Sequence, residues 1–200
     1  MPTVRGILRR GLTVDGLKEF IIAQGSSKSV VTMEWDKLWA FNKKRIETTA
    51  KRYFAVCANN TFEVEVRGLS KSTADVPWHP KDSAMGSRKL AVDTSLLIDH
   101  VDGLRIRPGD TVTFMNIGNV KIEQRSIANR KIIAVADLDN KDYKKTLKVS
   151  WIAKSATQVP FAANFVENII SKKVLAPDDD FKNYIRKVAR YKFSDMSSLC

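Results

Sequence analysis

The feature that most constrains the fold of this chain is a change of hydrophobic periodicity close to residue 51. Before that point, apolar side chains recur every three to four residues, which is the spacing of an amphipathic helix. After it, short runs of β-branched and aromatic residues alternate with turns that contain Gly, Pro or Asn, which is the pattern of strands. The sequence therefore predicts an α+β protein, with an N-terminal helical segment over residues 1–50 and a strand-rich region over residues 51–200.

Two helices are expected in the first fifty residues. The first begins after Thr13, a suitable N-cap residue, and ends at Gly25, which tolerates the left-handed conformation found after helices. The second covers residues 32–45 and carries three consecutive basic residues in its last turn, where cations suit the helix dipole. The two apolar stripes are Leu17, Phe20 and Ile21, and Trp35, Leu38, Trp39 and Ile46. The tryptophans share a stripe with leucine, so they are expected in the core rather than at a base-stacking surface.

The strand-rich region is expected to form an antiparallel barrel or sandwich, because it contains many short strands at close spacing and no βαβ alternation. The predicted strands are 53–58, 61–67, 94–101, 111–117, 119–125, 131–138, 147–153 and 159–165. The first two flank Asn59-Asn60 as a hairpin, and residues 68–88 are expected to be a loop. Three aspartates before Phe181 predict one short C-terminal helix to Arg190, and residues 193–200 carry no clear element.

Charge is the strongest compositional signal. The 200 residues carry a formal net charge of +12, and a domain this basic usually binds a polyanion such as a nucleic acid. No apolar run approaches the ~20 residues of a membrane-spanning helix, so a membrane partner is not expected. Two cysteines and the lack of a secretory signal favour a reducing, cytoplasmic compartment.

The sequence offers no candidate for catalysis, cofactor binding or metal binding. It contains neither a Gly-rich phosphate loop nor a nucleophile elbow or a paired-histidine zinc motif. His79 and His100 are interpreted as structural or solvent-exposed, and Asp178–Asp180 as helix-capping carboxylates rather than a metal site. A complete enzyme is therefore not expected in this chain.

What the chain has instead is a set of basic side chains suited to phosphate contacts. They occur in short clusters, with one aromatic residue, Tyr143, expected at the surface among them. The candidate RNA-binding residues are Arg5, Arg9, Arg10, Lys43, Lys44, Arg45, Lys121, Arg125, Lys141, Tyr143, Lys144 and Lys145. A further basic group, from Lys182 to Lys192, is expected along one side of the C-terminal helix.

Several segments resemble the glutamyl-tRNA synthetases of the eukaryotic and archaeal type, a class I family with the glutaminyl-type anticodon-binding domain. The segments that carry the resemblance are Pro2–Lys18, Ala23–Val31, Met33–Lys44, Asp110–Asn116, Asn140–Thr146 and Lys148–Trp151. The related glutaminyl enzymes are much less similar over Met33–Lys44, so glutamate is favoured.

The resemblance implies that residues 1–50 are a stem-contact segment at the end of the catalytic region, and that residues 51–200 form most of a β-barrel anticodon-binding region. The implied partner is tRNA(Glu), and the implied parent enzyme uses ATP to charge it with glutamate. The family's ATP-handling motifs would lie before Pro2, so this chain alone is expected to be catalytically inactive. The resemblance also implies that the barrel is incomplete at its C-terminus. The alternative is a truncated interaction module that docks on other synthetases, scaffold proteins or the full-length enzyme through an unpaired strand edge.

Overall fold

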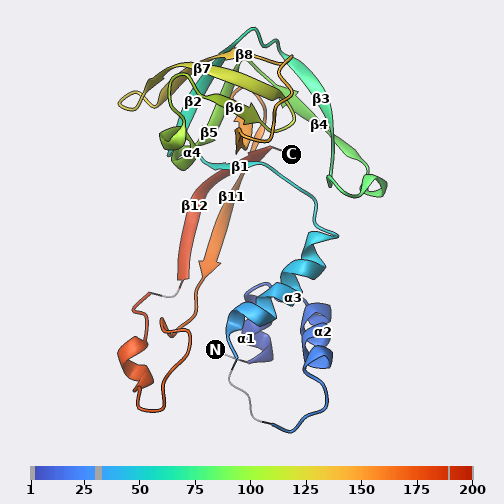
Figure 1. Ribbon diagram of the computed structural model, residues 1–200, viewed down its shortest axis with the longest axis vertical. Helices are drawn as coiled ribbons and strands as arrows, with labels where there is room; N and C mark the ends of the chain where they lie inside the picture. The colour runs from blue at the N-terminus through green and yellow to red at the C-terminus, as the bar shows by residue number, and fades with distance from the viewer. Residues whose placement is uncertain (1–2, 30–32, 189, 200) are drawn as a thin grey trace. The chain divides into compact units, whose positions relative to one another are not determined.

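The computed structural model describes residues 3–29, 33–188 and 190–199. The chain divides into two compact units (Figure 1). One unit contains Met1–Ala50 together with Asn164–Lys192, and the other contains Lys51–Ala163 together with Phe193–Cys200. The first unit is therefore assembled from two segments that are far apart in the sequence.

The first unit contains three helices, α1 (Val4–Arg9), α2 (Val14–Gln24) and α3 (Trp35–Glu47). The predicted start of α2 is confirmed, because the Thr13 hydroxyl accepts a hydrogen bond of 3.0 Å from the backbone N–H of Gly16. Its predicted end is also confirmed, since Gly25 follows the helix with φ of +75°. The first part of the range predicted for α3, residues 30–32, lies outside the described residues.

Helices α2 and α3 contact each other through a polar junction that the apolar stripes did not reveal. Asn42 is 6% exposed, and its carboxamide oxygen accepts hydrogen bonds from the Thr13 backbone N–H at 2.8 Å and from the Thr13 hydroxyl at 2.9 Å. Its amide nitrogen donates to the carbonyl of Gly11 at 3.0 Å. Gly16 faces α3 here, because a Cβ at Gly16 would lie 3.2 Å from the Asn42 Cα. The buried face of α2 is therefore rotated away from Ile21, which is 57% exposed.

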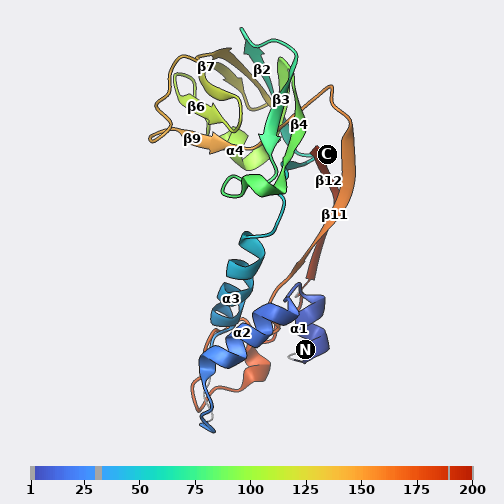
Figure 2. The same ribbon diagram turned by 90° about the vertical axis from the view of Figure 1, so that its right-hand side faces the viewer.

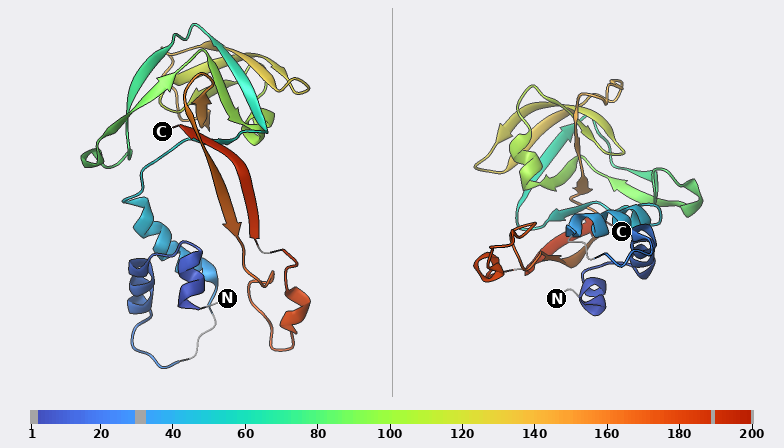
Figure 3. Two further views of the ribbon diagram at one scale, coloured as in Figure 1. Left: turned by 180° about the vertical axis from the view of Figure 1, so that it is seen from behind. Right: turned by 60° about the horizontal axis from the view of Figure 1, so that its bottom comes forward.

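The small apolar core of this unit is built around Ile7, Leu12 and Leu38. Trp35 and Trp39 pack against this cluster while remaining partly exposed, so their predicted core position is confirmed in part. Ile46, the last member of the predicted α3 stripe, is 37% exposed. Figure 3 shows the three helices from two further directions.

The predicted C-terminal helix over residues 181–190 is wrong. Among the described residues of this range, the one helical element is a 3₁₀ turn, η2 (Phe181–Tyr184), and Ile185 after it is extended with ψ of 123°. Strand β12 then runs from Arg190 to Leu199, although no element was expected from residue 193 on. The apolar spacing that suggested a helix instead serves a folded turn, in which Ile185 bridges to Ile170 in antiparallel fashion.

Asp179 holds this turn together. Its carboxylate accepts hydrogen bonds from the Lys172 ammonium, from the backbone N–H of Ala176 at 2.6 Å and from the Tyr184 hydroxyl at 2.8 Å. These three donors, the Lys172 ammonium first, lower the pKa of Asp179 to about 2.

A pH prediction follows for residues 172–185. Because the pKa of Asp179 is depressed in the folded turn, its contribution to stability is present above the unfolded value of 3.8 and is lost as the pH falls towards 2. We expect amide hydrogens of this segment to lose protection between about pH 4 and pH 2. Hydrogen exchange followed by mass spectrometry measures this, and Asp179→Asn should remove the transition. An identical pH profile in that variant would contradict the assignment.

The second unit is a nearly closed barrel of seven strands. They are β2 (Thr61–Arg67), β5 (Ser95–Asp99), β6 (Thr111–Phe114), β7 (Gly118–Ser126), β8 (Lys131–Ala136), β9 (Leu147–Val149) and β10 (Trp151–Ala153). Their order in the sheet is β10-β5-β2-β8-β7-β6-β9. The two end strands, β9 and β10, are separated only by Ser150, so one residue joins the two edges of the sheet. Figure 2 shows how the strands curve around the enclosed core.

The α+β class with a barrel is confirmed, but the sheet is mixed rather than purely antiparallel. Strand β2 pairs with β8 in parallel, and β6 pairs with β9 in parallel. The predicted single strand over residues 147–153 is in fact two strands, which occupy opposite ends of the sheet order. Trp151, expected in the core, is fully buried, and its indole N–H donates to the Met115 carbonyl at 2.7 Å.

Strand β2 shows why the barrel forms. Its side chains alternate between a buried set, Phe62, Val64 and Val66, and a partly exposed set that includes Glu63 and Glu65. This period of two directs one face into the barrel and the other outward. A short helix, α4 (His100–Arg105), follows β5 because Asp99 caps it by accepting from the Val101 N–H at 3.0 Å. The predicted strand 94–101 therefore ends early, and His100 lies in a helix.

Residues 68–88 are not the loop that was expected. They contain strand β3 (Ser72–Pro77), which pairs with β4 (Ser87–Val92) as a separate two-stranded sheet, with a 3₁₀ turn, η1 (Ser83–Met85), between them. Strand β3 was missed because only Val76 on it is buried, so its apolar alternation is weak.

The expected hairpin at Asn59-Asn60 is also wrong. Strand β1 (Ala55–Cys57) does not pair with β2; it pairs with β12, which lies between β1 and β11 (Gln158–Val166) in a three-stranded sheet. Arg130 contacts the turn at residues 59–60. Its guanidinium donates to the carbonyl of Asn59 and to the side-chain oxygen of Asn60, both at 3.2 Å.

Candidate nucleic-acid interface

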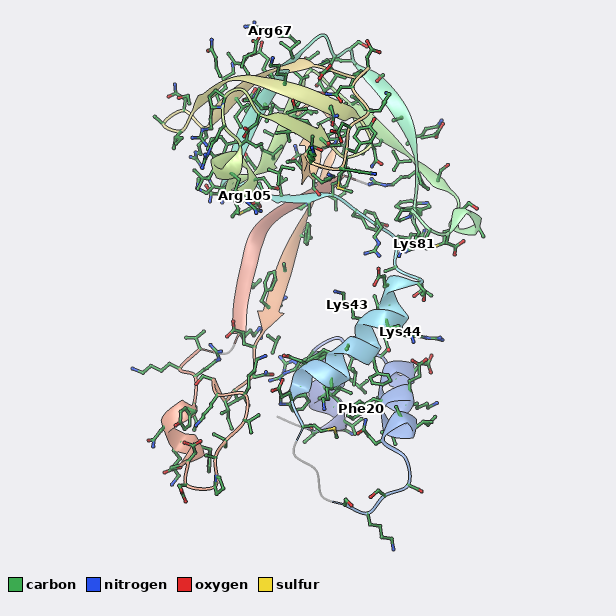
Figure 4. The ribbon with its side chains drawn as sticks, viewed as in Figure 1. Phe20, Lys43, Lys44, Arg67, Lys81 and Arg105 are labelled. Atoms are coloured by element: carbon green, nitrogen blue, oxygen red, sulfur yellow. The ribbon has the colours of Figure 1, made fainter. Side chains whose placement is uncertain are left out.

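Some basic side chains of the first unit are exposed, and others make ion pairs or hydrogen bonds within the protein. Arg5 and Arg9 are exposed on α1, and Lys43 and Lys44 are exposed near the end of α3. Figure 4 shows the last two extending away from the helix. Exposed cations on a rigid helix are suited to phosphate contacts.

Three arginines among the sequence candidates make contacts within the protein. Arg45 forms long ion pairs with Asp15 at 3.5 Å and Glu19 at 3.9 Å. Arg125 donates to the carbonyls of Leu104 and Ile106 at 2.9 and 2.6 Å, where it closes the end of α4. Arg10 donates to the carbonyl of Glu167 at 3.2 Å.

The outer face of β2 is not a free basic surface. Lys154 lies 2.8 Å from Glu63, Lys131 lies 3.0 Å from Glu65, and Arg67 lies 3.1 Å from Glu123. Hydrogen bonds from Lys154 and then Ser95 hold the pKa of Glu63 below its ordinary value, so this carboxylate stays charged. Positive charge on this face is therefore largely neutralised by neighbouring carboxylates.

The segment 139–146 brings together four of the remaining candidates. Lys141, Tyr143, Lys144 and Lys145 are all exposed, and Tyr143 is 39% exposed. Asn119, which is fully buried, fixes the segment to β7 by donating to the carbonyls of Asn140 and Asp142 at 3.0 and 3.1 Å. The Lys141 ammonium donates to the carbonyl of Leu138 at 2.5 Å, so the loop presents Lys144, Lys145 and the Tyr143 ring.

A polar hollow of about 560 Å³ lies beside this loop. Lys145 lines it together with Asn140, Asp142 and Asp110. On β7, Lys121 is exposed opposite Thr111.

Sequence reasoning missed an aromatic and cationic cluster in the barrel unit. Tyr53 and Trp78 have ring centroids 5.2 Å apart, and the Lys51 ammonium lies 4.6 Å from the centre of the Trp78 ring. The guanidinium of Arg88, which is only 7% exposed, lies 5.5 Å from the Trp78 ring and 5.6 Å from the Tyr53 ring. These are cation–π distances.

The cluster leaves aromatic surface open next to a cation. Tyr53 is 50% exposed and Trp78 is partly exposed. The backbone fixes Trp78, because its N–H donates to Gly86 at 3.0 Å and its carbonyl accepts from Arg52 at 2.8 Å. Unpaired bases stack on aromatic surfaces of this kind, while nearby cations contact phosphates. The signal was present as Lys51-Arg52-Tyr53 and Trp78, but these segments are far apart in the sequence and meet only in the fold, where the backbone N–H of Arg52 donates to the Trp78 carbonyl.

The two histidines pack against other residues of the barrel unit. His79 is 3% exposed and its Nδ1 accepts a hydrogen bond of 3.2 Å from the Lys81 backbone N–H, so the structural interpretation holds. His100 packs against Phe62, with ring centroids 5.5 Å apart. Within the described ranges, no group of three or more His, Cys, Asp or Glu residues is arranged to hold a metal ion. Nor is any helix among those residues long and apolar enough to span a membrane.

Two family models match the chain in succession. Residues 1–48 match the catalytic domain of the class I tRNA synthetases for E and Q, and residues 50–140 match the anticodon-binding domain of the same family. The boundary between the two matches coincides with the change of periodicity in the sequence and with the end of the first segment of unit one.

Curated relatives match nearly the whole chain. A bifunctional glutamate/proline–tRNA ligase of Drosophila melanogaster is 47% identical over 192 residues, which is 92% of this chain and 11% of the relative. The mouse protein of the same name is 44% identical over 95% of the chain and 13% of its own length. The cytoplasmic glutamate–tRNA ligase of Saccharomyces cerevisiae is 33% identical over 92% of the chain and 26% of its own length.

This chain thus spans about a quarter or less of the length of these relatives. Two successive domains of one family match this chain, and the second match falls on the barrel. The chain therefore belongs to the class I tRNA synthetases for E and Q and contains their anticodon-binding domain.

Proposed function

We propose that this chain is the tRNA-binding part of a glutamate–tRNA ligase and that it binds the anticodon arm of tRNA(Glu). The observation that carries the proposal is the match of residues 50–140 to the anticodon-binding domain, over a barrel that presents Lys144, Lys145 and the Tyr53–Trp78 rings. The names of the relatives, all of them glutamate–tRNA ligases, support glutamate as the amino acid.

The proposed mechanism combines electrostatic docking with base stacking. Exposed lysines, among them Lys121, Lys144 and Lys145, neutralise phosphates and release their counterions, which supplies most of the affinity. In the helical unit, Arg9, Lys43 and Lys44 act in the same way on the stem. The Tyr53–Trp78 rings take unpaired bases of the loop, whose faces are free to stack. Readout of the anticodon then depends on the stacked bases rather than on the phosphates.

The test is fluorescence anisotropy with a tRNA(Glu) transcript, an anticodon-swapped transcript and an unrelated tRNA, each over a salt series. We expect affinity to fall with salt by a slope of about 0.7–0.9 for each phosphate neutralised, and to fall again on the anticodon swap. Lys144→Gln combined with Lys145→Gln should lower the slope by about 1.5, since two phosphate contacts are lost.

The matched control is Lys131→Gln. That lysine already pairs with Glu65 at 3.0 Å, so its removal should leave the slope close to the wild-type value. Absence of binding at low salt, or binding that is insensitive to salt, would overturn the proposal. A chain that binds other synthetases instead would then be an interaction module.

The remaining properties belong to the whole protein. We propose that it charges tRNA(Glu) with glutamate using ATP, in the cytoplasm, as the name of the yeast relative suggests. The bifunctional relatives join glutamate and proline ligases in one chain, which supports association with another synthetase or a scaffold protein as a further proposal.

A further inference from the structure

The first unit contains an apolar groove of about 860 Å³. Trp35 and Trp39 of α3 form one wall, and the opposite wall is formed by Ile169, Val174, Phe181 and Ile185. Three residues of that second wall, Val174, Phe181 and Ile185, remain about half exposed. The volume lies within the range of about 300–1,000 Å³ that small-molecule sites occupy.

Ion pairs join the two walls of the groove. The Lys173 ammonium lies 2.9 Å from Asp36 and 4.0 Å from Glu34, which ties the second wall to the start of α3. The same wall is kept folded by the hydrogen bonds of Asp179 described above. A groove bounded in this way offers a preformed apolar surface rather than one that must be assembled around a ligand.

Most of the charges along the groove are held in ion pairs. Among its lining residues, the carboxylates of Glu34 and Asp36 face Lys173, and that of Glu167 lies 3.0 Å from Arg186. Lys172 pairs with Asp179. Arg10 is the exception: it also lines the groove, and the described residues place no carboxylate within ion-pair distance of it, only the carbonyl of Glu167 at 3.2 Å.

An apolar groove with one unneutralised guanidinium at its edge selects a particular chemistry. We propose that it binds a small amphipathic organic anion, with the apolar body between the tryptophans and the opposite wall and a single carboxylate or sulfonate on Arg10. Hydrogen bonds from guanidinium to an anion are the strong, charge-assisted kind. The apolar walls suit a hydrocarbon body better than a nucleobase, whose polar edges would go unpaired there. The proposal does not depend on tRNA binding.

The test uses 8-anilinonaphthalene-1-sulfonate as a fluorescent probe on the whole chain. We expect saturable enhancement of its fluorescence, displacement by decanoate, and much weaker displacement by decanol. Arg10→Gln should weaken probe and decanoate binding about tenfold, because a charged hydrogen-bond partner is lost. Arg9→Gln removes the same charge from the exposed neighbouring position and should change binding by less than about twofold.

A second variant locates the probe. Val174→Asp places a charge in the groove at a half-exposed position that should leave the fold intact, and it should abolish the enhancement. Three results would each overturn the proposal: binding by Arg10→Gln equal to wild type, decanol as effective as decanoate, or full enhancement in Val174→Asp with an unchanged melting temperature.

Discussion

Gly103→Ala should strongly lower the free energy of unfolding of the barrel, although it adds only one methyl group. A Cβ at Gly103 would lie 2.3 Å from Cδ2 and 2.4 Å from Cγ of the Phe62 ring. Phe62 is fully buried in the core and cannot swing away without displacing its neighbours. Alanine would favour the α4 helix by about 1 kcal/mol, whereas overpacking of this kind costs about 3 kcal/mol. We therefore expect a net loss of about 2 kcal/mol or more in the free energy of unfolding.

Urea denaturation measures this loss, and two further variants test its cause. Val101→Ala, on the same short helix but 60% exposed, should change stability by less than about 0.5 kcal/mol. Phe62→Ala destabilises by itself, yet adding Gly103→Ala to it should cost much less than in the wild type, because Cγ and Cδ2 are gone and only the contact of 2.9 Å with Cβ remains. Additive losses in the double variant would show that steric conflict with Phe62 is not the reason.

Trp78→Ala should produce the largest loss of RNA affinity from a single substitution. If bases stack on the Tyr53–Trp78 rings as proposed, removing the indole costs about 1–3 kcal/mol, or roughly 5- to 150-fold in Kd. The salt slope should stay constant, because no phosphate contact is removed. Anisotropy titrations with the tRNA(Glu) transcript over a salt series separate the two effects.

Two controls make the Trp78 result interpretable. Trp78→Phe keeps an aromatic face and should retain most of the affinity, whereas Phe181→Ala removes a half-exposed ring from the other unit and should have little effect. Circular dichroism and melting curves confirm that each variant is folded. Wild-type affinity in folded Trp78→Ala would remove the stacking surface from the proposed interface.

Local signals in the sequence predicted most of the elements. Thr13 and Gly25 marked the ends of α2 because caps act through the nearest few residues. Alternation marked β2 over its full length, since Phe62, Val64 and Val66 all point into the barrel. These signals depend on positions close together in the chain, so they survive without knowledge of the tertiary structure.

The wrong predictions concern segments that pair with strands far away in the sequence. Residues 190–199 pair as a strand with β1, more than 130 positions earlier, and this pairing overrode the helical spacing that precedes them. Strands β1 and β2 looked like a hairpin, but each is paired with strands from elsewhere in the chain. The candidate interface shows the same limit. Single lysines were visible in the sequence, whereas the contact of Lys51 with Trp78 arises only in the fold, next to the hydrogen bond from the Arg52 N–H to the Trp78 carbonyl.

The late position of β10 in the chain delays closure of the barrel during synthesis. Strand β10 pairs with β5, and its Trp151 fills the centre of the core, so the ring of strands stays open until Trp151–Ala153 have been made. At about 5–20 residues per second, some 5 to 20 seconds pass between synthesis of β2 and that of β10. Once β5 has been made, the nascent barrel keeps one edge of that strand unpaired until β10 follows, so chaperone protection should matter during this stretch of synthesis.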